Sequence, residues 1–211
     1  MFATGAILLC FAFFVLQATS FIALQSFMPL SLHQLYGLPM VTATATVTAF
    51  MLGSAAGTMA GGVMADRSGQ HQRIIMGGLA LAALVLFLVG QIELPLALLL
   101  AAVALAGALA GLTTPSRDML VRAAAPAGAS GKVFGFVYSG LDLGATLTPA
   151  LIGSLLDAGQ PRAVFLVVPV VMAASILTAT TIRAERREAG HAGPMAGHAL
   201  DQEAASKEPA Q

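Results

Sequence analysis

The stretch Gly62–Arg73, GVMADRSGQHQR, joins two long apolar runs at residues 40–65 and 74–90. It contains two arginines, one aspartate and two glycines, with a histidine among them. A short charged turn between two runs of this length marks the position of a membrane surface, because each run is long enough to cross the hydrocarbon core. The stretch therefore predicts two membrane-spanning helices that are joined at one face of a bilayer.

The composition of the whole chain supports a membrane protein. Of its 211 residues, 57% are hydrophobic and only 9% are charged, and the mean hydropathy is +0.85. Soluble domains average about 25% charged residues. The formal net charge is +0, and the charges lie in short breaks and in the last part of the chain. No basic face is available to neutralise phosphates, so nucleic acid is excluded as a partner.

The apolar runs predict an all-α, polytopic bundle of six transmembrane helices, at about residues 4–30, 40–65, 74–90, 96–114, 133–156 and 163–182. Pro29 and the segment 33–39 are expected to end the first span. Pro115 fits the end of the fourth span, although the helix itself can continue through Arg122. The first run is interpreted as a span and not as a removed leader. Residues 183–211 lose the apolar pattern and are predicted to be a disordered cytoplasmic tail.

Sequence features of enzymes and metal sites are missing from the printed sequence. The single cysteine, Cys10, lies in an apolar run, and the four histidines lie in loops or in the tail. They form no Cys/His ligand spacing. No nucleophile–base pair and no phosphate-binding loop is present either. We therefore expect no enzymatic activity, no metal and no cofactor.

The Lys and Arg residues predict the orientation. Alternate breaks hold nine of the ten: Arg67 and Arg73; Arg117, Arg122 and Lys132; and Arg183, Arg186, Arg187 and Lys207. The opposite breaks hold only Arg162. Basic loops favour the cytoplasm, so both termini are expected to be cytoplasmic, with the protein in the plasma membrane (the bacterial inner membrane).

The charged turn also resembles a known signature. The pattern Gly62-x-x-x-Asp66-Arg67-x-Gly69 on the cytoplasmic side is similar to the signature loop of the major facilitator superfamily. Two positions that are usually basic hold Gln70 and His71 here, and a basic residue, Arg73, follows slightly later. Pro115–Asp157 resembles a second region of these transporters, with Gly131-Lys132-x-x-Gly135 and Gly153-x-x-x-Asp157.

The resemblance implies roles for the residues of the motif. Gly62 would permit close approach of a neighbouring helix, and Gly69 would turn the chain. Asp66 would meet a helix N-terminus or an arginine across the bundle, and Arg67 would stay at the level of the lipid headgroups. With Arg73, these residues are expected to act in gating and topology and not in contacting a ligand.

Members of this family normally have twelve spans in two six-helix halves, so the chain is expected to be one half. The polar tail and the charge-free start favour the C-terminal half. The implied function is secondary transport of a small organic solute, driven by an ion gradient. The implied partners are the lipid bilayer, the solute, and either a second six-helix half or a second copy of the chain. The alternative is a non-transporting half-transporter fragment or a membrane interaction subunit.

Polar residues inside spans mark a transport path by default, because they are costly there. Asp142 lies about 14 Å into its span at about 1.5 Å per residue, near the middle of a hydrocarbon core that is roughly 30 Å thick. A poorly solvated carboxylate can take up a proton, so Asp142 is a candidate proton- or cation-coupling residue. The alternative is an acid that holds helices in register through hydrogen bonds to nearby hydroxyls or to a basic loop residue.

Three further polar residues are solute or proton candidates. Gln17 and Gln25 share one helix face with Phe21 and either line the cavity or bond between helices. Tyr138 precedes Asp142 by four residues, so it is expected to share the same face and hydrogen-bond network. The third and sixth spans are aliphatic and are not expected to touch the solute.

Two other patterns have a structural and a functional interpretation. Gly53, Gly57 and Gly61 form a stripe that favours close helix packing, with contact to the solute as the alternative. Arg117, Asp118 and Arg122 are interpreted as solvated loop residues, with a cytoplasmic gate salt bridge as the alternative.

Overall fold

The computed structural model describes residues 2–68, 70–124 and 130–181. All regular structure within these residues is helical. The elements are α1 (Phe2–Tyr36), α2 (Met40–Ser68), α3 (His71–Gln91), α4 (Leu96–Ala124), α5 (Ser130–Asp157) and a sixth helix, Ala163–Thr181. Each of the six is long and apolar enough to cross a membrane. The predicted all-α bundle of six membrane helices is thus confirmed.

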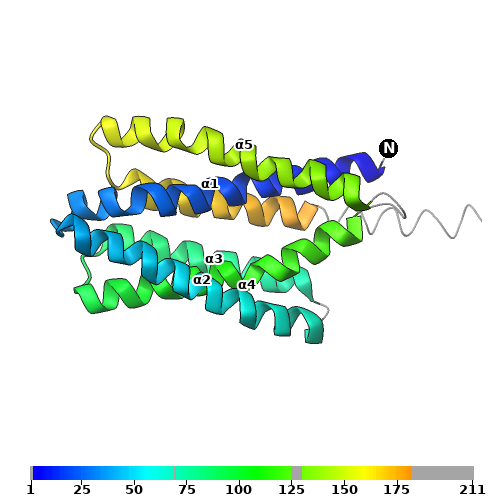
Figure 1. Ribbon diagram of the computed structural model, residues 1–211, viewed down its shortest axis with the longest axis horizontal. Coiled ribbons are helices and arrows are strands. Elements are labelled where there is room, and N and C mark those ends of the chain that lie inside the picture. The colour runs from blue at the N-terminus through cyan, green and yellow to red at the C-terminus, as the bar shows by residue number, and fades with distance from the viewer. Residues whose placement is uncertain (1, 69, 125–129, 182–211) are drawn as a thin grey trace, which may run out of the picture.

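The helices run roughly along one common axis (Figure 1). α1 packs along α5, while α4 packs along both α2 and α3. The sixth helix contributes Val164, Phe165 and Val168 to the core that it shares with α1 and α3. The chain begins at the same end of the bundle at which α2, α4 and the sixth helix finish (Figure 1). The connections at residues 37–39, 92–95 and 158–162 lie at the other end.

Four prolines lie inside the described helices and do not end them: Pro29 in α1, Pro115 in α4, Pro149 in α5 and Pro169 in the sixth helix. A proline leaves the carbonyl four residues earlier without its helical hydrogen bond, which is Gly111 for Pro115. The Thr58 hydroxyl on α2 donates to that Gly111 oxygen at 3.3 Å and to Ser54 O at 2.9 Å. A neighbouring hydroxyl thus compensates for the missing bond. α4 continues ten residues beyond Thr114, where the predicted span ends, and reaches Ala124, two residues beyond the Arg122 that the helix was expected to include.

The glycine stripe of α2 is a packing surface. A Cβ at Gly53, Gly57 or Gly61 would collide with backbone atoms of α4, at Ala104, Ala108 and Leu112 in turn. The arrangement is reciprocal, because a Cβ at Gly107 or Gly111 of α4 would collide with the backbone of α2 at Phe50 and Ser54. Glycine therefore sets the separation of these two helices. α5 approaches α1 in the same way through Gly140 and Gly144.

At the end of the bundle away from the N-terminus, α1 is attached to α3 by Tyr36. The Tyr36 hydroxyl donates a bifurcated hydrogen bond to two backbone carbonyl oxygens at the end of α3, Val89 O at 2.7 Å and Ile92 O at 2.6 Å. The chain then reverses at Gly37, which has φ +64°. A side chain at that φ is strained, so glycine is the residue that fits.

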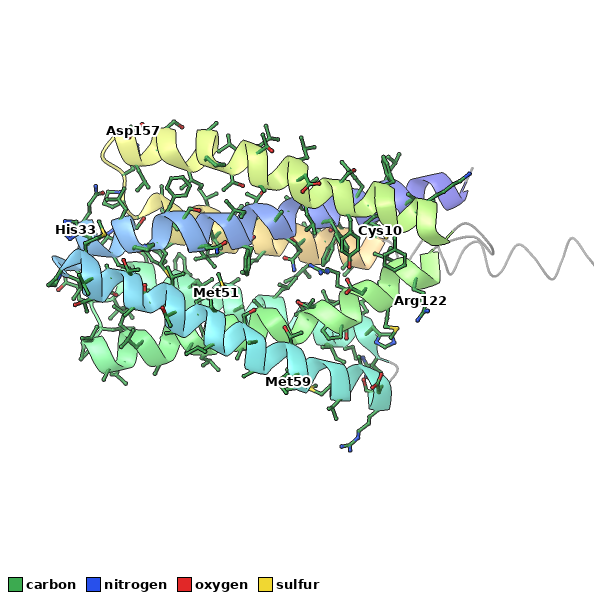
Figure 2. All side chains as sticks on the ribbon, in the orientation of Figure 1. Cys10, His33, Met51, Met59, Arg122 and Asp157 are labelled. Carbon is green, nitrogen blue, oxygen red and sulfur yellow. The ribbon has the colours of Figure 1, made fainter. Side chains whose placement is uncertain are left out.

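The basic residues are divided between the two ends. Arg67, Arg73, Arg122 and Lys132 are exposed and flank the connections at the N-terminal end, whereas Arg162 lies at the other end. Figure 2 shows Arg122 at the first end, and His33 and Asp157 at the second. The expected tail, residues 183–211, lies outside the described residues.

Candidate functional site

A cavity of about 380 Å³ opens between the helices. Its polar lining comprises Gln17 and Ser20 of α1, Ser54 of α2, Thr114 and Arg117 of α4, and Asp142 of α5. Apolar side chains, among them Phe21, Leu24, Phe50 and Leu141, form the remaining wall. The volume falls within the range of small-molecule sites, and an apolar wall with a few polar groups is their usual lining.

Two of the four predicted solute or proton candidates line this cavity. Gln17 lies near the middle of α1 and is half-buried, and Asp142 lies near the middle of α5 and is exposed to the open side. Gln25 is exposed two turns further along α1 and does not reach the cavity. It shares a helix face with Gln17, but at roughly 12 Å along the axis it lies beyond the cavity.

Tyr138 belongs to an aromatic cluster next to the cavity. Its ring lies 5.1 Å from the Phe14 ring and 5.8 Å from the Phe134 ring, measured between centroids. Asp118 and Arg117 of α4 are the charged residues near its hydroxyl. The expected hydrogen-bond network with Asp142 is not formed among the described residues. The Asp142 backbone oxygen instead accepts from Thr146 Oγ1 at 2.7 Å.

Arg117 is a cavity residue that the sequence analysis did not choose. Ala110, Thr114 and Arg117 are spaced i, i+4, i+7 along α4 and all line the cavity. This spacing puts them on one helix face. The periodic pattern was present in the sequence, but ending the span at Thr114 because of Pro115 placed Arg117 among the loop residues. Its side chain is only 15% exposed, so Arg117 is not a solvated loop residue.

The third and sixth helices each contribute one apolar residue to the lining, Leu79 and Met172. Both helices therefore form part of the cavity wall, and the expectation that they do not touch the solute stays a prediction. Both side chains are buried, and α3, which carries Leu79, packs along α4.

The residues of the signature loop lie at the N-terminal end of the bundle, away from the cavity. Among the described residues, no neighbouring element comes within 4 Å of the place where a Gly62 Cβ would stand, so the close approach expected at Gly62 is made by Gly61 instead. Asp66 and Arg67 are both exposed, and neither forms an ion pair within the described part of the chain. Arg73 donates from Nη1 to Gln70 Oε1 at 2.8 Å. Gly69 lies outside the described residues.

Six apolar helices around a cavity with a partly polar wall define a polytopic membrane protein of the transporter class. The family description Major Facilitator Superfamily matches residues 7–208, and the chain belongs to this superfamily. It is therefore a protein of a transporter family and not of an enzyme family.

Solved transporter structures share the fold. A mutant of peptide transporter POT in complex with sulfate aligns with a TM-score of 0.73 at 19% identity, over 94% of this chain and 44% of that chain. A mutant of peptide transporter POT in complex with alafosfalin aligns with a TM-score of 0.72 at 20% identity, over 96% and 46%. A POT family transporter in complex with a thioalcohol conjugated peptide aligns with a TM-score of 0.72 at 18% identity, over 85% and 38%.

The chain thus spans less than half the length of these transporters and matches one half of their fold. No curated protein matches it in sequence.

Proposed function

We propose that this chain is one half of a secondary active transporter that moves a small organic solute by means of an ion gradient. The observation that carries the proposal is the cavity, which Gln17 and Asp142 both line from near the middle of two different spans. Carriers of this kind bind their solute near the bilayer midplane and alternate access around it. Gln17 would hydrogen-bond the solute and Asp142 would carry the coupling proton or cation. Gln25 and Tyr138, which lie outside the cavity, are weaker candidates for solute contact.

We further propose that a second six-helix unit completes the cavity. Asp142 and Phe21 line it and are nevertheless exposed in the single chain, which supports a covering partner. That partner is a different six-helix half or a second copy of this chain. The polar composition of residues 183–211 supports assignment of this chain as the C-terminal half.

The distribution of charge supports a location and an orientation. Arg67, Arg73, Arg122 and Lys132 gather at one end of the bundle, and that end is proposed to face the cytoplasm. Both termini would then be cytoplasmic, with the bundle in the bacterial inner membrane.

The test is solute flux into liposomes that contain the purified chain. A panel of labelled organic solutes is offered under an imposed pH gradient, and accumulation that a protonophore abolishes is the expected result. An oligomeric state measured in the same membranes shows whether two copies form the working unit. Absence of flux for every solute, from a well-folded chain, would contradict transport by this chain alone and favour the non-transporting alternative. The chain's length, under half that of its structural neighbours, is the observation behind that alternative.

The signature loop is proposed to act in gating. Asp66 is exposed at the N-terminal end, far from the cavity, so Asp66→Ala should lower the maximal transport rate while solute affinity changes little. We expect the rate to fall by about tenfold, which corresponds to roughly 1.4 kcal/mol. The control is Glu93→Ala, which removes an exposed carboxylate at the opposite end. An equal loss of affinity in Asp66→Ala would contradict a gating role.

A further inference from the structure

Arg117 is held in a defined position inside the bundle. Its guanidinium carbon lies 4.5 Å from the centroid of the Phe14 ring, which is fully buried on α1. A guanidinium over an aromatic face is attracted by the ring and is restrained in its orientation. The same side chain lines the cavity. It is therefore a cation that is directed at the cavity by a contact with a second helix.

Most of the hydrogen-bonding capacity of this guanidinium is unused. Nε donates to Asp118 Oδ1 at 3.2 Å. Within residues 2–68, 70–124 and 130–181, Nη1 and Nη2 donate to no carboxylate and no backbone carbonyl, and the Tyr138 hydroxyl of α5 is the neighbouring polar group. The Asp118 side chain is 38% exposed, so water shares in solvating it and it neutralises Arg117 only in part. The two remaining nitrogens form the planar fork that binds an oxyanion through parallel hydrogen bonds.

The rest of the wall indicates what kind of anion fits. Phe21, Phe50, Leu24 and Met172 surround the polar groups, and such a surface favours an apolar body. Arg117 and Asp142 are the only charged residues of the lining, so Arg117 is the one cation there that an acidic group can bind.

We propose that Arg117 is the anion-binding residue of this cavity, and that its ligand is an organic acid with a carboxylate or similar oxyanion on an apolar body. This inference rests on the proposed function, because it assumes that the cavity is the solute site. The chemical class of the solute and the role of Arg117 in binding it are new. Arg117 binds the oxyanion through the Nη fork, Phe14 holds the guanidinium, and the apolar wall receives the body.

The test uses binding, which does not require transport. Phenylacetate and phenylacetamide have the same shape and differ in charge, so they are offered to the detergent-purified chain. Binding is followed by calorimetry and by the temperature at which a thiol-reactive dye labels Cys10, which is 1% exposed in the folded chain. We expect phenylacetate to bind at least about tenfold more tightly than phenylacetamide, as hydrogen bonds to a charged group allow.

Substitutions then assign the preference to a residue. Arg117→Gln should abolish the difference between acid and amide, and Arg117→Lys should keep part of it, because a point charge remains without the fork. The matched control is Arg122→Gln, an exposed arginine five residues further along α4 and outside the cavity, which should leave the preference intact. If Arg117→Gln fails to fold, the comparison of the two ligands on the unaltered chain and the Lys variant still decide.

The possible outcomes separate the two proposals. Equal binding of acid and amide by the unaltered chain would overturn the role of Arg117, and so would a preference that survives in Arg117→Gln. Loss of the preference in Arg122→Gln would show general charge attraction and would also overturn it. Binding that follows the prediction without any solute flux would support the anion site and contradict only transport by this chain alone.

Discussion

Replacing Gly57 by alanine should separate α2 from α4 and destabilise the bundle more than any other single methyl group that could be added to α2. The new Cβ would stand 2.8 Å from Ala108 Cα and closer still to the Ala108 carbonyl. These are backbone atoms, so no rotamer change relieves the contact. Overpacking a close-packed contact typically costs about 1–3 kcal/mol, and a backbone collision belongs at the upper end of that range.

The measurement is thermal unfolding in detergent, followed by dye labelling of Cys10, the only cysteine of the chain. We expect the labelling midpoint of Gly57→Ala to fall by the order of 10 °C. The chain contains no tryptophan, which makes a thiol probe more suitable than intrinsic fluorescence.

Gly62→Ala provides the matched control in the same helix. No neighbouring element in the described part of the chain comes within 4 Å of its Cβ position, and alanine favours a helix over glycine by about 1 kcal/mol. The midpoint of this variant should therefore stay unchanged or rise slightly. Equal midpoints for Gly57→Ala and Gly62→Ala would show that α2 and α4 are not held at the separation described here.

The second large effect is expected at Asp142, if it carries the coupling proton. Asp142→Asn keeps the shape of the side chain and removes its ability to take up and release a proton. Accumulation driven by a pH gradient should fall by about tenfold or more, which lies within the usual range of coupling between two sites. Exchange of labelled for unlabelled solute, which needs no net proton movement, should continue.

Asp157→Asn is the control for this experiment. Asp157 ends the same helix, is exposed and lies outside the cavity, so its variant should accumulate solute normally. Asp142→Glu, which keeps a titratable group, should retain part of the accumulation. Unchanged pH-dependent accumulation by Asp142→Asn would remove Asp142 as the coupling site and leave the alternative, that this acid holds helices in register.

The charge of Asp142 should also affect anion binding at Arg117. An ionised Asp142 repels an anion bound at Arg117, because both residues line one cavity. Asp118 and Tyr138 are the other titratable groups near Arg117. Linkage between two ligands is reciprocal, so removing the negative charge of Asp142 should not weaken anion binding. Asp142→Asn should therefore bind phenylacetate at least as tightly as the unaltered chain, although it fails to accumulate solute.

Six spans and the division of basic residues between two ends followed from the sequence because both are local properties. A run of apolar residues long enough for the hydrocarbon core is visible without knowing its neighbours, and so is a charged break such as Gly62–Arg73. The midspan position of Asp142 could be counted from the end of its run in the same way. The packing stripe at Gly53, Gly57 and Gly61 also followed, because its fourfold spacing defines one helix face.

Contacts between helices required the tertiary structure. Gly61 and Gly62 are neighbours in sequence, but successive helical residues point about 100° apart, so only Gly61 meets α4. Arg117 lines the cavity because α4 continues past Pro115, whose freed carbonyl at Gly111 accepts from Thr58 of another helix. Gln25 and Tyr138 lie outside the cavity because its ends are set by how α1, α4 and α5 cross. The sequence by itself determined which segments enter the membrane, and the packing of the helices decided which side chains meet inside it.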